Sequence, residues 1–232
     1  MKYLLTFPLL LTFVFSAAGA EPGRMTCSRS KADFEPSADP ASPHWKSVKP
    51  LLVELNPMGE KAKNRYEVRT QWTPKYLYFL FTCPYDELNL KPDPSTTTET
   101  YKLWEWDVAE LFIGADFDNI MRYREFQVSP LGEWIDLDID RSKMNAEAAW
   151  KWDSGFTVKG RIDRAKKIWH GEMKIPAESI DASGPAREGK QYRLNLYRLA
   201  GKTPDRESVM WQPTMVRNHH TPEKFGVMVL TK

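Results

Sequence analysis

Three short runs of alternating polar and apolar residues constrain the fold more than any other feature of the sequence. They lie at residues 103–113, 123–128 and 134–140, and turn-forming residues separate each run from the next. Side chains of a β-strand point alternately to its two faces, so a period of two suits a strand with one face on a core and the other in water. The sequence therefore predicts three consecutive strands in this region.

The rest of the chain continues this pattern with further short strands and almost no helix. Only Pro176 to Ile180 has the proline start that suits a single helical turn. Many short strands with turns between them are typical of an antiparallel β-sandwich, either jelly-roll or immunoglobulin-like. We predict an all-β fold of about ten strands with very little helix. The expected strands are 51–55, 66–72, 76–83, 103–113, 123–128, 134–140, 156–162, 168–175, 192–199 and 225–230.

The first residues have the features of a secretory signal peptide. Lys2 supplies a positive charge, an apolar stretch follows, and Ala18-Gly19-Ala20 is a small-x-small cleavage site. We therefore predict a signal peptide at 1–20, an extended lead-in at 21–44 and one β-sandwich at 45–232. The mature protein is expected to be secreted or periplasmic.

Charge and motifs narrow the classes of function. The formal net charge is +2, which gives no reason to expect nucleic acid as a partner. No run beyond the signal peptide is long and apolar enough to suggest a membrane span. The sequence contains no Gly-x-Ser-x-Gly, no His-Glu-x-x-His and no glycine-rich phosphate loop. We therefore predict a binding module and not an enzyme, with the oligomeric state left open.

The only two cysteines are Cys27 and Cys83. Outside the cytoplasm they could form one disulfide that ties the N-terminal segment to the end of a strand. The alternative is two unpaired thiols, with Cys83 behaving as a small buried hydrophobic residue. Both alternatives remain open at this point.

Residues with the chemistry of sugar recognition gather in and around the three alternating runs. A sugar ring has apolar C–H faces and a rim of hydroxyls, so an indole can cover a face while carboxylates and amides bind the rim. Glu125 and Gln127 are two residues apart and therefore share one face of their strand. The candidate sugar-binding residues are Trp104, Glu110, Glu125, Gln127 and Asn195.

Two of these candidates have alternative structural roles. Trp104 could be a core indole, and Trp106 is a rival because it would share the face of Trp104 in a regular strand. Glu110 could be the ion-pair partner of an arginine such as Arg198. The sequence does not decide between these alternatives.

Acidic residues also suggest a calcium site. Asp116 and Asp118 belong to a loop-like Asp-Phe-Asp-Asn cluster, and oxygen ligands of this kind suit Ca²⁺. Asp136, Asp138 and Asp140 would line one face of an extended strand, where a solvated face is the favoured interpretation. We therefore name Asp116 and Asp118 as the candidate metal ligands.

Five sequence blocks occur in an order that resembles family 9 carbohydrate-binding modules, over residues 40–232. The resemblance implies a β-sandwich that binds sugars, often chain ends, between two aromatic side chains. It also implies structural calcium and an association with glycoside hydrolases in glycan breakdown. The blocks are Tyr76-Leu77-Tyr78 with Asp86, Trp-Glu-x-Asp-x-x-Glu-Leu-Phe-Ile at 104–113, Phe-Gln-Val-Ser-Pro-Leu-Gly at 126–132, Arg-Leu-Asn-Leu-Tyr-Arg at 193–198, and His-Thr-Pro-Glu-Lys-Phe-Gly at 220–226.

The resemblance also assigns roles to individual residues. Trp104 matches one wall of the sugar slot, and Glu110 matches a residue that hydrogen-bonds sugar hydroxyls. Gln127 falls where some members use an arginine for the same purpose. The second aromatic wall corresponds to His219, with His220 beside it. A histidine can stack on a sugar ring, but it is smaller and more polar than tryptophan.

Two other classes of function remain as alternatives. Similar sandwiches can hold b-type haem between a methionine and a histidine for electron transfer. A surface module for protein interaction is the second alternative. The residues available as haem ligands are Met121, Met210, Met215, His170, His219 and His220.

Overall fold

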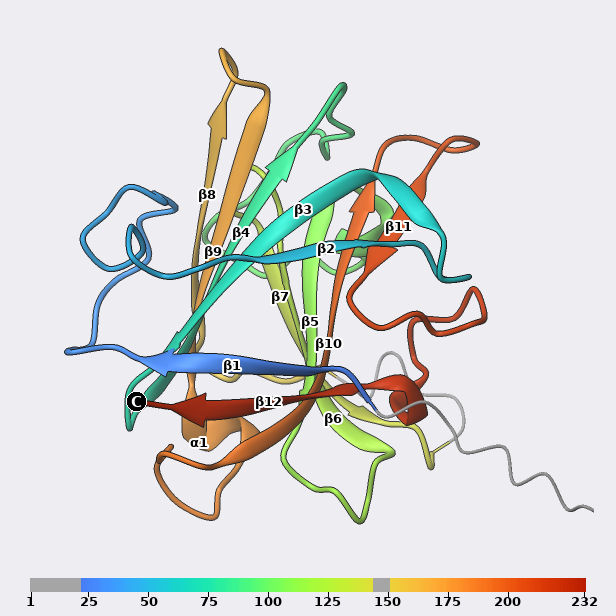
Figure 1. Ribbon diagram of the computed structural model, residues 1–232. Coiled ribbons are helices and arrows are strands. Elements are labelled where there is room, and N and C mark those ends of the chain that lie inside the picture. Colours follow the sequence, from blue (N-terminus) through green and yellow to red (C-terminus); the bar gives the residue numbers. More distant parts are fainter. Residues whose placement is uncertain (1–21, 144–150) are drawn as a thin grey trace, which may run out of the picture.

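The computed structural model describes residues 22–143 and 151–232. Within these residues the chain forms twelve strands, one short α-helix and two 3₁₀ helices (Figure 1). The helical elements are α1 (Ala177–Ile180), η1 (Leu103–Glu105) and η3 (Pro222–Lys224). The strands are β1 (Arg24–Arg29), β2 (Leu51–Leu55), β3 (Lys61–Trp72), β4 (Tyr76–Pro84), β5 (Val108–Gly114), β6 (Arg122–Val128), β7 (Trp134–Asp140), β8 (Thr157–Asp163), β9 (Ile168–Pro176), β10 (Gln191–Ala200), β11 (Glu207–Met210) and β12 (Gly226–Thr231).

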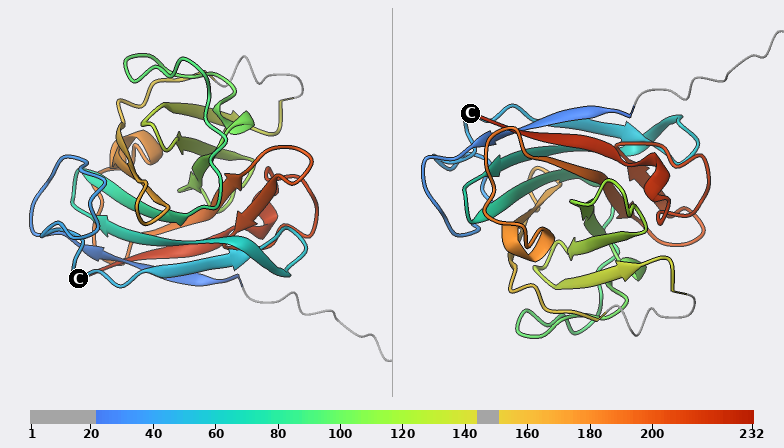
Figure 2. Two further views of the ribbon diagram at one scale, coloured as in Figure 1. Left: turned by 90° about the horizontal axis from the view of Figure 1, so that it is seen from above. Right: turned by 90° about the horizontal axis from the view of Figure 1, so that it is seen from below.

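The strands are connected in the order β7-β6-β5-β10-β11-β2-β3-β4-β9-β8. β12 pairs with β10, and β1 lies between β12 and β3. Figure 2 shows the resulting two layers, with β1, β2, β3 and β12 in one and β5, β6 and β7 in the other. The predicted all-β sandwich is confirmed, and the pairings of β1 with β12 and β3 are the parallel exceptions in an otherwise antiparallel arrangement.

The main core lies between the two layers. On β5 the inward side chains are Ala109, Leu111 and Ile113, and Phe126 and Val128 of β6 join the same cluster. The period of two in the sequence therefore correctly predicts which residues of β5 and β6 face the core. Burying such apolar side chains supplies most of the driving force for folding.

The outer face of β5, β6 and β10 is also buried, because loops cover it. Phe112, Tyr123 and Tyr197 form a second apolar cluster there with Phe225. Trp104 packs against the edge of this cluster and is itself half-buried. The alternation predicted a solvated outer face, whereas the structure has a second, partly polar layer on it.

The segment at 21–44 corrects the predicted domain boundary. Arg24–Arg29 forms the strand β1 inside the sheet, and so the segment is not only a lead-in. Further along, Phe34 stacks on Tyr78 with ring centroids 3.9 Å apart. Buried Glu172 accepts hydrogen bonds from Trp45 Nε1 and from two backbone amides of this segment. The sandwich thus begins at β1. The signal peptide predicted at 1–20 lies outside the described residues.

The two cysteines are free and fully buried in the main core. The disulfide alternative is therefore wrong for this structure, because both thiols are separate parts of the apolar packing. Burial raises the pKa of each thiol to about 12, since the thiolate would lose its hydration.

We expect neither thiol to react with a thiol-specific reagent in the native protein, because the thiolate is the reactive form and both sulfurs are inaccessible. In denaturant without reductant, both thiols should react. A colorimetric thiol titration of native and denatured protein measures this. A protein in which no thiol reacts after denaturation would contain the disulfide and would contradict the structure.

Candidate functional site

A cavity of about 290 Å³ lies on the outer face of β5 and β6, beneath the segment 217–220. Its volume is close to the lower limit of ligand pockets, about 300 Å³. Four of the predicted sugar-binding residues line it. The lining residues are Trp104, Glu110, Phe112, Glu125, Leu137, Leu199, Arg217, Asn218, His219 and His220.

Trp104 belongs to the 3₁₀ helix η1 and not to a strand, which corrects the predicted strand at 103–113. Lys102, the residue directly before η1, lies in the left-handed region at φ 63°. The strand β5 starts only at Val108. Arg206 Nη2 donates hydrogen bonds of 2.6 and 2.5 Å to the carbonyls of Trp104 and Trp106. The argument for Trp106 as a rival wall relied on a regular strand, and Trp106 does not line the cavity.

Glu110 and Glu125 form the acidic wall of the cavity. Glu110 pairs with Gln127 across β5 and β6, and Glu125 is two residues before Gln127, so all three share one face. Only 2% of Glu110 and 3% of Glu125 are exposed. Gln127 is fully buried behind them and donates a hydrogen bond from Nε2 to Glu125 Oε1.

The imidazole of His219 lies next to Glu110 at this acidic wall. It stacks on Tyr197 with centroids 4.7 Å apart and an interplanar angle of 10°. His219 Nε2 lies 2.7 Å from Ser208 Oγ, and Nδ1 lies 3.4 Å from Glu110 Oε2. The ring therefore combines a stacking surface with two polar edges.

His220 lies beside His219 and packs on the apolar cluster. Its ring stacks on Phe112 with centroids 5.0 Å apart, and Nδ1 lies 2.7 Å from the Tyr123 hydroxyl. Burial, together with the smaller effects of the Arg141 and His219 charges, lowers the pKa of His220 to about 3. The ring is therefore neutral near pH 7.

Asn195 does not line the cavity, because internal hydrogen bonds occupy its amide. Its Oδ1 accepts from the Gln212 amide at 2.9 Å, and its Nδ2 donates to the Gln212 carbonyl at 2.8 Å. This sequence candidate thus fastens the chain that follows β11 onto β10.

Arg198 is not the partner of Glu110, and the arginine whose charge attracts Glu110 is Arg206. In the register of β5 and β10, Glu110 lies opposite Tyr197, and Arg198 points to the other face. The Arg198 guanidinium donates to the carbonyls of Asn64, Arg65 and Pro84 inside the sandwich.

The acidic loop does not offer a complete set of calcium ligands. Asp116 Oδ1 accepts hydrogen bonds from the amides of Asp118 and Asn119, so one of its oxygens stabilises its own turn. No group of three or more His, Cys, Asp or Glu residues is placed to hold a metal ion within residues 22–143 and 151–232. Calcium binding by Asp116 and Asp118 stays a prediction.

The aspartates of β7 have separate partners instead of forming a solvated face. Asp136 is buried and accepts hydrogen bonds from the amide and hydroxyl of Ser154. Asp138 pairs with Arg124, and Asp140 accepts from Ser142. These partners explain how three carboxylates on one strand face can lie so close together.

Sequence reasoning missed Phe112, Leu137, Leu199, Arg217 and Asn218 as lining residues. The alternation could have found Phe112, because it shares a strand face with Glu110. Leu137 required the register, in which it lies opposite Glu125. For haem, the cavity contains two of the proposed histidines and none of the three proposed methionines.

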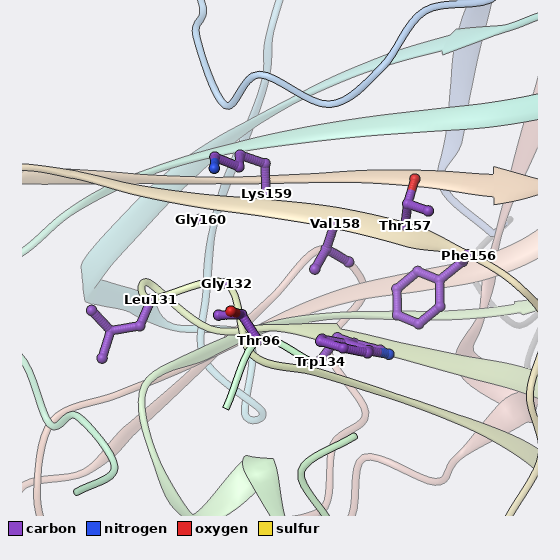
Figure 3. A pocket seen from close by; sticks show the side chains of 9 residues that line it. All are labelled: Thr96, Leu131, Gly132, Trp134, Phe156, Thr157, Val158, Lys159 and Gly160. Carbon is purple, nitrogen blue, oxygen red and sulfur yellow. The ribbon is translucent and has the colours of Figure 1, made fainter. Parts of the chain in front are cut away.

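A second cavity, of about 350 Å³, lies between β7 and β8 (Figure 3). Trp134, Phe156 and Val158 face one another across it, whereas the polar ends of Thr157 and Lys159 point away from Trp134. This cavity has an indole but no buried carboxylate in its lining. The cavity at Trp104 is therefore the stronger candidate for a polar ligand.

No helix among the described residues is long and apolar enough to cross a membrane. Neither protein-family models nor curated proteins gave a match to this sequence.

Solved structures share the fold at low sequence identity. Two are a family 9 carbohydrate-binding module of Caldicellulosiruptor kristjanssonii, in complex with cellotriose and with glucose. They match with TM-scores of 0.65 and 0.64 and identities of 13% and 12%, over 90% of this chain and 94% and 96% of theirs. A third, described as a carbohydrate-binding protein of Bacteroides uniformis, matches with a TM-score of 0.66 and 14% identity over 89% of this chain and 98% of its own. The chain therefore has the fold of these proteins.

We expect Arg206→Met to loosen the loop that carries Trp104, because three carbonyls lose their donor, including that of Gly201. The free energy of unfolding should fall by about 2 kcal/mol. Hydrogen exchange of the amides at 103–107 should also become faster than in the unmodified protein. Urea unfolding and hydrogen-exchange mass spectrometry measure the two effects.

The matched control is Arg187→Met, because Arg187 is exposed and its side chain has no recorded hydrogen bond or ion pair among the described residues. It should leave both measurements unchanged. Equal effects of the two variants would show that Arg206 does not hold the loop.

Proposed function

We propose that this protein is a non-catalytic carbohydrate-binding module that holds a mono- or oligosaccharide in the cavity between Trp104 and His219. The observation that carries the proposal is the convergence of an indole, an imidazole and two buried carboxylates on one small cavity. These side chains come from segments far apart in the chain, and the fold alone brings them together.

The arrangement suits the two surfaces of a sugar. Trp104 offers an apolar face for the C–H bonds of the ring, and its partly exposed position leaves that face open to a ligand. Glu110 and Glu125 supply acceptors for hydroxyl groups, and such charge-assisted hydrogen bonds are stronger than neutral ones. His219 adds a second flat surface to the lining, and its stacking on Tyr197 holds the ring in place.

The structural neighbours support the same function. Two of them contain cellotriose or glucose, and the shared fold covers 90% of this chain. We further propose that the protein acts outside the cytoplasm in glycan breakdown. The predicted signal peptide and the sequence resemblance support this part of the proposal.

The first test is isothermal titration of the purified protein with glucose, cellobiose, xylobiose and galactose. We expect saturable binding of at least one sugar, because the cavity offers both a stacking surface and buried acceptors. Trp104→Ala should weaken this binding by about tenfold or more, which corresponds to about 1.4 kcal/mol.

Trp134→Ala is the matched control, because it removes a partly exposed indole from the other cavity. It should leave the affinity unchanged. If Trp134→Ala abolishes binding and Trp104→Ala does not, the ligand site is the cavity between β7 and β8. If no sugar binds to the folded protein, the proposal fails, and a protein-interaction module becomes the better interpretation.

A further inference from the structure

The cavity at Trp104 carries more negative charge in its buried wall than a neutral sugar requires. Glu110 and Glu125 project from neighbouring strands into a space of about 290 Å³. Both are at least nine-tenths buried. Burying two carboxylates this close together is costly, because each loses hydration and repels the other.

The described neighbours of Glu110 leave one of its carboxylate oxygens without a hydrogen bond. Its Oε2 is buried and accepts no hydrogen bond from residues 22–143 or 151–232, and the nearest recorded nitrogen is His219 Nδ1 at 3.4 Å. Gln127 lies directly opposite on β6, but its amide is neutral and its donor is directed to Glu125. Glu110 Oε2 can thus accept a hydrogen bond that no described residue donates.

The other described polar groups around the cavity donate no hydrogen bond to Glu110 Oε2 either. His220 is neutral near pH 7, and its Nδ1 is engaged with the Tyr123 hydroxyl. The Arg206 guanidinium attracts the charge of Glu110, but its recorded hydrogen bonds go to the carbonyls of Gly201, Trp104 and Trp106. Arg217 is exposed at the rim, and no ion pair between it and Glu110 is recorded among the described residues.

We propose that the cavity selects sugars that carry a free, protonated primary amine over neutral sugars of the same size. This inference rests on the proposed function and specifies its ligand class. An ammonium group supplies three donors and a positive charge, which match the unpaired oxygen of Glu110 and the adjacent Glu125. A neutral hydroxyl supplies one donor and no positive charge.

The test compares glucosamine, N-acetylglucosamine and glucose by isothermal titration at about pH 6, where a primary amine with a pKa near 8 is protonated. We expect glucosamine to bind about tenfold or more tightly than glucose. N-acetylglucosamine should lose this advantage, because acetylation removes the charge and leaves the rest of the ring in place.

Glu110→Gln identifies the group responsible, since it removes the charge with little change of shape. The ratio of the affinities for glucosamine and glucose should fall to about twofold or less. Glu105→Gln is the matched control, because Glu105 is exposed next to Trp104 but does not line the cavity. It changes the net charge equally and should retain the full preference.

A pH series on the unmodified protein keeps the test decisive if Glu110→Gln fails to fold. Between about pH 6 and about pH 9 the ligand amine loses its proton, and the preference should disappear.

The outcomes separate this inference from the proposed function. Glucose binding as tight as glucosamine binding, in a protein that needs Trp104, would overturn the amine preference and leave the sugar site intact. A preference that persists in both Glu110→Gln and Glu125→Gln would also overturn it. Absence of binding by every sugar would overturn the proposed function and this inference with it.

Discussion

The site depends on the way β10 holds the segment 212–222, which covers the outer face of the sandwich. Three alternate residues of β10 do this: Arg193 donates to the Pro222 carbonyl, Asn195 exchanges hydrogen bonds with Gln212, and the Tyr197 hydroxyl donates to the His219 carbonyl. Because they are spaced by two, they lie on one face and fix the cover at three points. The cavity is the space left between this cover and the acidic wall of β5 and β6.

This arrangement explains which part of the site could be predicted from the sequence. The alternation showed that Glu125 and Gln127 share a strand face, and the fold class followed from the number of short strands. Alternation says which side of a strand a residue occupies, but not what covers that side. Asn195 was therefore grouped with the sugar ligands, although its amide fastens the cover in place.

Two errors in the predicted strands, at residues 103–113 and before residue 45, have a similar cause. The strand assigned to 103–113 begins five residues late, because Lys102 adopts a left-handed conformation and η1 follows. The segment before residue 45 has few apolar residues, yet β1 gains its pairing from β12 at the other end of the chain. Pairing between the ends of a chain leaves no local pattern, so single-sequence reasoning cannot detect it.

The burial of Glu110 and Glu125 is best understood as preorganisation. Two carboxylates next to Phe112 and Leu137 destabilise the folded chain, so the sandwich must hold them there through its other contacts. Their position is fixed by the ladder between β5 and β6, which is paired over five residue positions. A ligand that supplies donors or a positive charge then recovers part of the desolvation free energy already lost on folding. Removing one carboxylate should therefore stabilise the free protein while it weakens the complex, and opposite signs in these two quantities distinguish a ligand-binding carboxylate from a structural one.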